Sequence, residues 1–102
     1  MQIIELHADD WVTAADFANA LKKAIGAPDW HGSSVDAFLD SMIVHDEINA
    51  LKSPYTIRIG GVDKAKPEVQ DAIRLLARLI NERGASDRGT ELEVTILVED
   101  SG

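Results

Sequence analysis

The fold is decided by residues 55–98, which read Tyr55-Thr56-Ile57-Arg58-Ile59, then Gly60-Gly61, then a segment that opens at Pro67, and finally Leu92-Glu93-Val94-Thr95-Ile96-Leu97-Val98. The first and last runs are rich in β-branched residues and predict two strands. The segment between them has apolar residues at the period of a helix: Val69, Ile73, Leu76 and Ile80. Pro67 suits the first turn of that helix and Gly84 its end. A strand–helix–strand order predicts a parallel pair with a right-handed crossover.

The residues before this unit predict one more strand and two more helices. Gln2–Leu6 is short and β-branched, which favours a strand. Thr13 or Asp16 is expected to cap a helix that runs to about Ile25, because one apolar stripe recurs at helical spacing: Phe17, Ala18, Leu21, Ala24 and Ile25. Gly26 and Pro28 are expected to end it.

A second helix is expected to begin after Ser33 or Ser34. Ser33 and Asp36 have the spacing of a capping box. The apolar stripe of this helix consists of Val35, Phe38, Leu39 and Met42, and a further helical turn is expected around Ile48 and Leu51. The sequence therefore predicts an α/β fold in a single domain over residues 1–102, with a small three-stranded parallel sheet packed with three to four helices. We expect 85–90 to be a flexible loop.

The charge of the chain excludes some partners. Its 102 residues include 18 acidic and 10 basic side chains, for a formal net charge of −8, of which residues 1–51 carry −7. Such a surface repels nucleic acid, because phosphate binding requires clustered Lys and Arg, but it attracts a cationic protein. Acidity can equally serve solubility alone. No apolar run is long enough to span a membrane, and no secretory signal is visible, so we expect a cytoplasmic protein.

The sequence offers little for catalysis, so we expect no enzyme and no cofactor. The chain has no cysteine, which excludes a thiolate nucleophile. His7, His31 and His45 are scattered and lack partners at ligand spacing, so no metal site is expected. His31 is expected to pack or to face solvent beside Trp30. Gly60-Gly61 follows a strand, but it lacks the glycine spacing of a phosphate-binding loop.

The strongest candidates for function are two carboxylates and a tryptophan. Asp36 and Asp40 are four residues apart, so a helix places them on one face, where like charges are slightly destabilising. Asp36 lies in the first turn, where the helix dipole favours it, but Asp40 has no such reason to be there. Trp30 precedes this helix and is typical of an interface anchor. The alternatives are an ordinary solvated face for the two acids and a core position for Trp30.

The stretch 21–40 resembles the barstar family of ribonuclease inhibitors. The shared pattern is a Lys-Lys helix end followed by P-x-x-x-G-x-x-x-D-A-x-x-D, which here starts at Pro28 and ends at Asp40. The order of elements along the rest of the chain is also similar. The sequence departs from the family at three places: Ser33-Ser34 replaces a polar residue and Asn, His31 replaces a second aromatic residue, and Leu39 stands where Trp is frequent.

The resemblance implies that this chain inhibits a small basic ribonuclease or a related nuclease toxin, as an immunity or antitoxin protein. It implies that the loop and second helix block the active-site cleft of the enzyme, as a monomer in a 1:1 complex. The partner-binding residues carried over are Trp30, His31, Gly32, Asp36, Ala37 and Asp40, with Glu82 as the nearest match to an acidic residue on the late helix.

Two other functions are compatible with parts of the sequence. One is a binding module of the same fold that uses the acidic helix on another basic protein without inhibiting it. The other is an acyl carrier protein, because Asp40-Ser41-Met42 resembles the motif in which a serine carries the phosphopantetheine arm. Carrier proteins are all-helical, however, and place that serine at a helix start.

Overall fold

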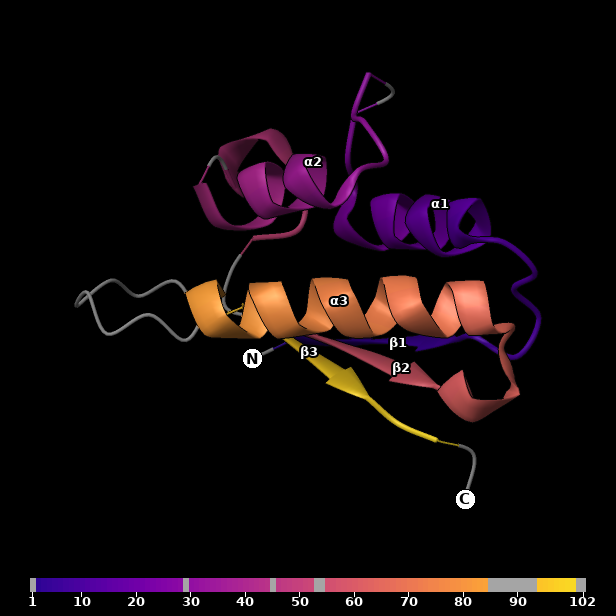
Figure 1. Cartoon of the computed structure of the whole chain (residues 1–102). Coiled ribbons are helices and arrows are strands. Elements are labelled where there is room, and N and C mark those ends of the chain that lie inside the picture. Colours follow the sequence, from indigo (N-terminus) through magenta and orange to yellow (C-terminus); the bar gives the residue numbers. More distant parts are fainter. Residues whose placement is uncertain (1, 29, 45, 53–54, 85–93, 101–102) are drawn as a thin grey trace.

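The computed structural model describes residues 2–28, 30–44, 46–52, 55–84 and 94–100. Its strands form one parallel sheet in the order β1-β2-β3, and the helices lie on one side of it (Figure 1). The strands are β1 (Gln2–His7), β2 (Tyr55–Gly60) and β3 (Val94–Val98). In the register of the sheet, Ile57 of β2 lies between Ile4 and Ile96. The α/β fold with a three-stranded parallel sheet is therefore confirmed.

Three α-helices cover the sheet, namely α1 (Ala14–Ile25), α2 (Val35–Leu39) and α3 (Pro67–Gly84). Short helical turns connect them to the strands: a π-helix over Asp40–Val44 and 3-10 helices over Asp46–Ile48 and Val62–Lys64. Figure 1 shows α1 and α2 together above α3, with the sheet beneath. Within the described part of the chain, no helix combines the length and the apolar character needed to cross a membrane.

Helix α1 begins and ends where its local sequence predicts. The Thr13 side chain accepts a hydrogen bond from the Asp16 amide, and the Asp16 carboxylate accepts from the Thr13 amide, which completes a capping box. Gly26 ends the helix in the left-handed conformation, with φ 66°. Its amide donates to carbonyls of the last turn, so the chain leaves α1 in a defined direction.

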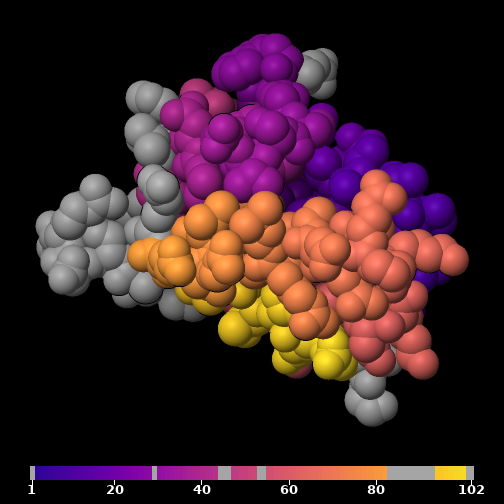
Figure 2. Space-filling view, in the orientation of Figure 1, coloured from indigo at the N-terminus to yellow at the C-terminus, as the bar shows by residue number. Residues whose placement is uncertain are grey.

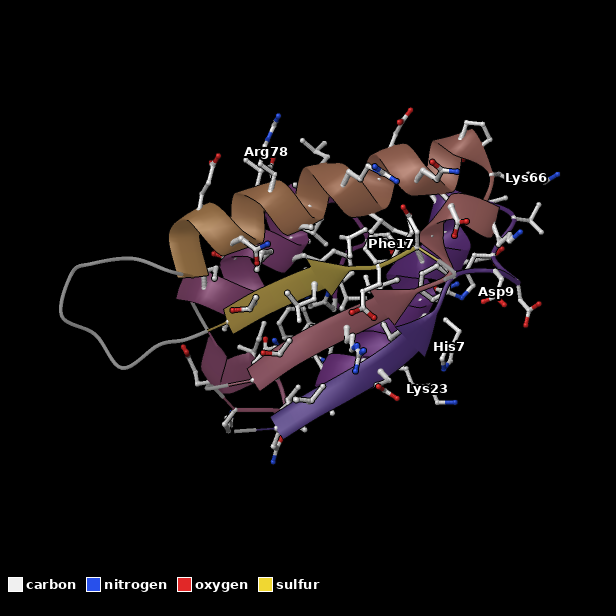
Figure 3. All side chains as sticks on the ribbon, turned by 90° about the horizontal axis from the view of Figure 1, so that it is seen from below. His7, Asp9, Phe17, Lys23, Lys66 and Arg78 are labelled. Carbon is white, nitrogen blue, oxygen red and sulfur yellow. The ribbon has the colours of Figure 1, made fainter. Side chains whose placement is uncertain are left out.

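The core forms from the apolar stripes that the sequence predicts. Val69, Ile73, Leu76 and Ile80 of α3 are all buried, as are Phe17, Ala18, Leu21 and Ile25 of α1, whereas Ala24 is only half-buried. They pack with the strand residues Ile57 and Ile96 in one cluster. In Figure 3 the three strands lie side by side, α3 runs alongside the sheet on the side of β3, and His7 and Asp9 lie at the end of the sheet where β1 finishes.

The second helix differs from its prediction in two ways. Its N-cap is Ser34, whose hydroxyl accepts from the Ala37 amide, so the predicted capping box of Ser33 with Asp36 is wrong. The α-helix also ends at Leu39 and continues as the π-helix. The wider turn of the π-helix accompanies the burial of three successive residues, Ser41, Met42 and Ile43, which a single α-helical stripe would not bury.

Other sequence predictions near the ends of elements have mixed outcomes. The strand predicted over 92–98 is described from Val94 onward, because 92 and 93 lie outside the described residues. The flexible loop expected at 85–90 also lies outside them. The helical turn expected around Ile48 and Leu51 is present only as the 3-10 helix Asp46–Ile48, and Leu51 lies beyond its end.

Candidate functional site

The loop between α1 and α2 projects from the molecule and exposes a large aromatic side chain. Trp30 is 73% exposed, so it does not fill the core between the helices. The space-filling view shows this segment as a knob above the helices (Figure 2). An exposed tryptophan on a projecting loop is typical of an interface anchor, since aromatic anchors supply much of the energy of many interfaces.

Helix α2 presents its two carboxylates to solvent. Asp36 lies in the first turn of the helix, and Asp40 lies where α2 passes into the π-helix. Both residues are exposed, whereas Phe38 on the opposite side is buried in the core. The last turn of α2 contains no basic residue. The helix therefore displays a negative face, anchored by Phe38 and oriented by its Ser34 cap.

Gly32 and Ala37 bring the loop and the helix into close approach. A methyl group placed on Gly32 would lie 3.3 Å from the Cβ atom of Ala37, a tight contact. Gly32 is exposed and Ala37 is half-buried. Small side chains at both positions therefore let the loop lie against the start of α2.

The side chain of His31 is buried, whereas that of Trp30 is exposed. Its side chain is only 5% exposed and packs on the ring of Phe38, with 5.0 Å between ring centroids. Its Nε2 atom lies 2.6 Å from Oγ of Ser41, and its Nδ1 atom contacts the carbonyl oxygen of Gly32. Of the two expected environments for this imidazole, the structure shows packing and not exposure to solvent. The ring supports the loop from beneath and leaves little surface for a partner.

Glu82 lies on the last turn of α3 and is exposed. Figure 1 shows this end of α3 on the same side of the molecule as α2. Helix α3 also contacts both α2 and the π-helix that follows it. No contact of Glu82 with Asp36 or Asp40 is described, and its role in binding stays a prediction.

The structure argues against the acyl carrier alternative. The fold is mixed α/β, whereas carrier proteins are all-helical, and Ser41 is only 1% exposed. Its hydroxyl is hydrogen-bonded to His31, so no prosthetic arm can reach it without unfolding of this region. Among residues whose placement is described, no group of three or more His, Asp or Glu side chains is arranged to hold a metal ion.

Sequence reasoning missed the support beneath the loop. Ser41 and Asn49 are both buried, and the Asn49 side-chain amide donates to the Ser41 carbonyl at 2.9 Å. Polar residues in an otherwise apolar stretch were the available signal, since Ser41 directly precedes the buried residues Met42 and Ile43. Their partners come from segments eight and ten residues away, which periodicity does not reveal.

Two comparisons with known proteins bear on this site. A protein-family model described as Barstar (barnase inhibitor) matches residues 1–99. A search of curated proteins finds no sequence that matches the chain. The matched range includes the projecting loop, both carboxylates of α2 and the whole sheet.

Proposed function

We propose that this chain, which belongs to the barstar family, inhibits a barnase-type ribonuclease through one surface. That surface is here named the acidic loop–helix surface and is formed by Trp30, Gly32, Asp36, Ala37 and Asp40. Family membership itself implies inhibition of a barnase-type ribonuclease by a protein that is not an enzyme. The members of the family bind barnase-like ribonucleases. The proposal adds the residues and the physical mechanism.

The observation that supports this proposal is that the loop with the exposed Trp30 leads directly into a helix with two exposed carboxylates. Asp36 lies in α2 and Asp40 lies one turn later, at the start of the π-helix, and Trp30 is exposed in the loop that leads into α2. The active-site cleft of a ribonuclease holds phosphate with cationic side chains. Carboxylates on a helix can occupy the positions of phosphates there, since charge-assisted hydrogen bonds to Lys and Arg are among the strongest in proteins.

The other residues of the predicted site receive different roles. We assign His31 to the support of the loop, because it is buried. Glu82 would supply a contact at the rim, where charges chiefly affect the association rate. We further infer a cytoplasmic monomer that forms a 1:1 complex with a ribonuclease or a related nuclease toxin. Direct binding of nucleic acid is not part of the proposal, because the net charge is −8.

A titration against a barnase-type ribonuclease, followed by RNA cleavage, tests the function and the surface together. The wild-type chain should inhibit stoichiometrically. Asp40→Ala should weaken inhibition by about a hundredfold, or about 3 kcal/mol, since the cationic groups of the cleft would lose their partner. Asp10→Ala is the matched control, because Asp10 is an exposed acid in the loop after β1. It removes the same charge and should inhibit like the wild type.

The outcomes separate the class from the site. Undiminished inhibition by Asp40→Ala would keep the inhibitor function and disprove the assigned surface. No inhibition by the wild-type chain would favour a binding module that uses the acidic helix on another basic protein. A pulldown from the native host with wild-type and Asp40→Ala chains would then identify that partner.

A further inference from the structure

A buried polar chain lies directly beneath the acidic loop–helix surface, and its members come from three successive segments. His31 belongs to the loop, Ser41 to the π-helix, and Asn49 follows the 3-10 helix Asp46–Ile48. We propose that the hydrogen bond between His31 and Ser41 is a clamp that fixes the loop of Trp30 against the helix of the two carboxylates, and so sets the affinity of the inhibitor. This inference rests on the proposed function.

The chemistry of the atoms defines how the clamp is made. The carbonyl oxygen of Gly32 can only accept, so the Nδ1 atom of His31 that contacts it carries the proton. In the neutral ring, Nε2 is then an acceptor, and the hydroxyl of Ser41 donates a hydrogen bond to it across 2.6 Å. The carbonyl of Ser41 in turn accepts from the side-chain amide of Asn49. One imidazole thus ties the backbone of the loop to the π-helix.

Packing reinforces the clamp and excludes water from it. The His31 ring lies on Phe38, which anchors α2 in the core. The backbone amide of His31 donates to the Pro28 carbonyl at 3.0 Å, so both the side chain and the backbone of this residue are engaged. His31, Ser41 and Asn49 are all buried. Hydrogen bonds in such a setting hold one geometry, because a broken one would leave a buried group unpaired.

The exposed side chains of the surface need this support. Trp30 is 73% exposed and projects from the loop that His31 ties to the core. A loop that samples many conformations loses affinity on binding, because its ordering must then be offset by the contacts that it makes. The clamp removes that cost in advance. His31 and Ser41 are therefore positioning residues, which act through Trp30 and do not touch the enzyme themselves.

The variant that tests the clamp is Ser41→Ala, which removes one hydroxyl and leaves Nε2 of His31 without its donor. Thr56→Val is the matched control, since it removes a buried hydroxyl from β2, which contributes no residue to the surface. Two quantities are measured: the kinetics of binding to the ribonuclease, and the hydrogen exchange of the His31 amide. Ser41→Ala should raise the dissociation rate about tenfold and leave the association rate and its salt dependence unchanged, because the surface charges remain. The His31 amide should exchange about tenfold faster.

A merely structural role for Ser41 predicts a different result. In that case, if Thr56→Val and Ser41→Ala lower the free energy of unfolding equally, they should change the dissociation rate and the His31 exchange rate equally. A double variant adds a second criterion. In a chain that already carries Trp30→Ala, Ser41→Ala should change the dissociation rate little, because the clamp acts through Trp30. An unchanged dissociation rate or an unchanged His31 exchange rate in Ser41→Ala overturns the clamp. If Asp40→Ala still inhibits more weakly than the wild type, the proposed function would remain supported. If the wild-type chain inhibits no ribonuclease, the proposed function fails, and the exchange measurement alone decides the clamp.

Discussion

Trp30 and His31 are neighbours in the chain, but one side chain is exposed and the other is buried. The indole is largely exposed, and the imidazole is packed on Phe38 and bonded to Ser41. Exposure of so large an apolar group gains nothing for folding, because the hydrophobic effect favours its burial. The exposure of Trp30 supports its proposed role in binding, and the contacts of His31 support the proposed clamp.

We expect Trp30→Ala to weaken inhibition without weakening the fold. Replacing an exposed side chain changes the free energy of unfolding by no more than about 0.5 kcal/mol. Removing an anchor residue weakens binding by about 2 kcal/mol or more, which corresponds to about a thirtyfold loss of affinity. Urea denaturation and the inhibition titration measure the two effects separately. Val12→Ala is the control, because Val12 is also an exposed apolar residue, 58% accessible, outside the surface. A Trp30→Ala chain that inhibits like the wild type would remove Trp30 from the site.

At the scale of elements, the C-terminal end of α1 determines how the projecting loop begins. Gly26 at its C-cap has φ 66°, and its carbonyl accepts a hydrogen bond from the amide of Ala50. A methyl group on Gly26 would lie 2.5 Å from the Cβ atom of Ala50. The position thus requires glycine both for its backbone conformation and for the close approach of the segment that follows the 3-10 helix.

Gly26→Ala is expected to destabilise the protein by about 2 kcal/mol, since a left-handed alanine is strained and the contact with Ala50 must yield. Denaturant unfolding measures this loss. Gly60→Ala is the matched control on β2, where the added methyl group would meet Nδ1 of His7 at an ordinary distance of 3.8 Å. It should cost under about 1 kcal/mol. Equal losses in the two variants would contradict the assigned role of Gly26.

The other end of α1 makes stability depend on pH. Backbone hydrogen bonds from Val12 and Thr13 lower the pKa of Asp16 below its usual value of 3.8. A carboxyl group with a lowered pKa in the folded state stabilises that state above its unfolded pKa, and the contribution is lost as the pH falls through the folded value. Asp16→Asn should therefore lower the Tm at neutral pH, and the difference from the wild type should shrink below about pH 4. A Tm difference that stays constant across this range would contradict the charged cap.

At the scale of the whole molecule, the uneven charge sets how the chain meets a basic partner. The net charge is −8, and residues 1–51, which include both the projecting loop and α2, carry −7 of it. A field of this sign accelerates the approach of a cationic enzyme and orients its cleft toward the acidic half. Salt screens that field, over about 10 Å at 0.1 M and about 3 Å at 1 M.

The association rate with a basic ribonuclease should therefore fall as NaCl is raised from about 0.1 to 1 M, while the dissociation rate changes less. Stopped-flow mixing measures both rates. A chain with Asp36→Asn and Asp40→Asn should show a shallower salt dependence, because it has lost two charges of the surface. An association rate that does not respond to salt would contradict electrostatic steering.

The positions of the strands and the apolar stripes of the helices were predictable from the sequence, because both depend on local periodicity and on turn residues. The stripe of α3 from Val69 to Ile80, the capping residue Thr13 and the terminating residue Gly26 are examples. The exposed carboxylates Asp36 and Asp40 also agree with their spacing on one helical face. The family resemblance was visible in residues 21–40 and is confirmed over residues 1–99.

Other features were decided only by tertiary contacts. Sequence left open whether Trp30 fills the core and whether His31 faces solvent, because neither residue lies in a periodic element. Their orientations depend on Phe38 and Ser41, which the fold brings under the loop. The π-helix likewise arises where Ser41, Met42 and Ile43 are buried together. The sequence by itself thus determined the strands, the helices α1 and α3, and the acidic face. The tertiary structure decided the π-helix and which of two neighbouring side chains turns outward, since burial depends on residues distant in the chain.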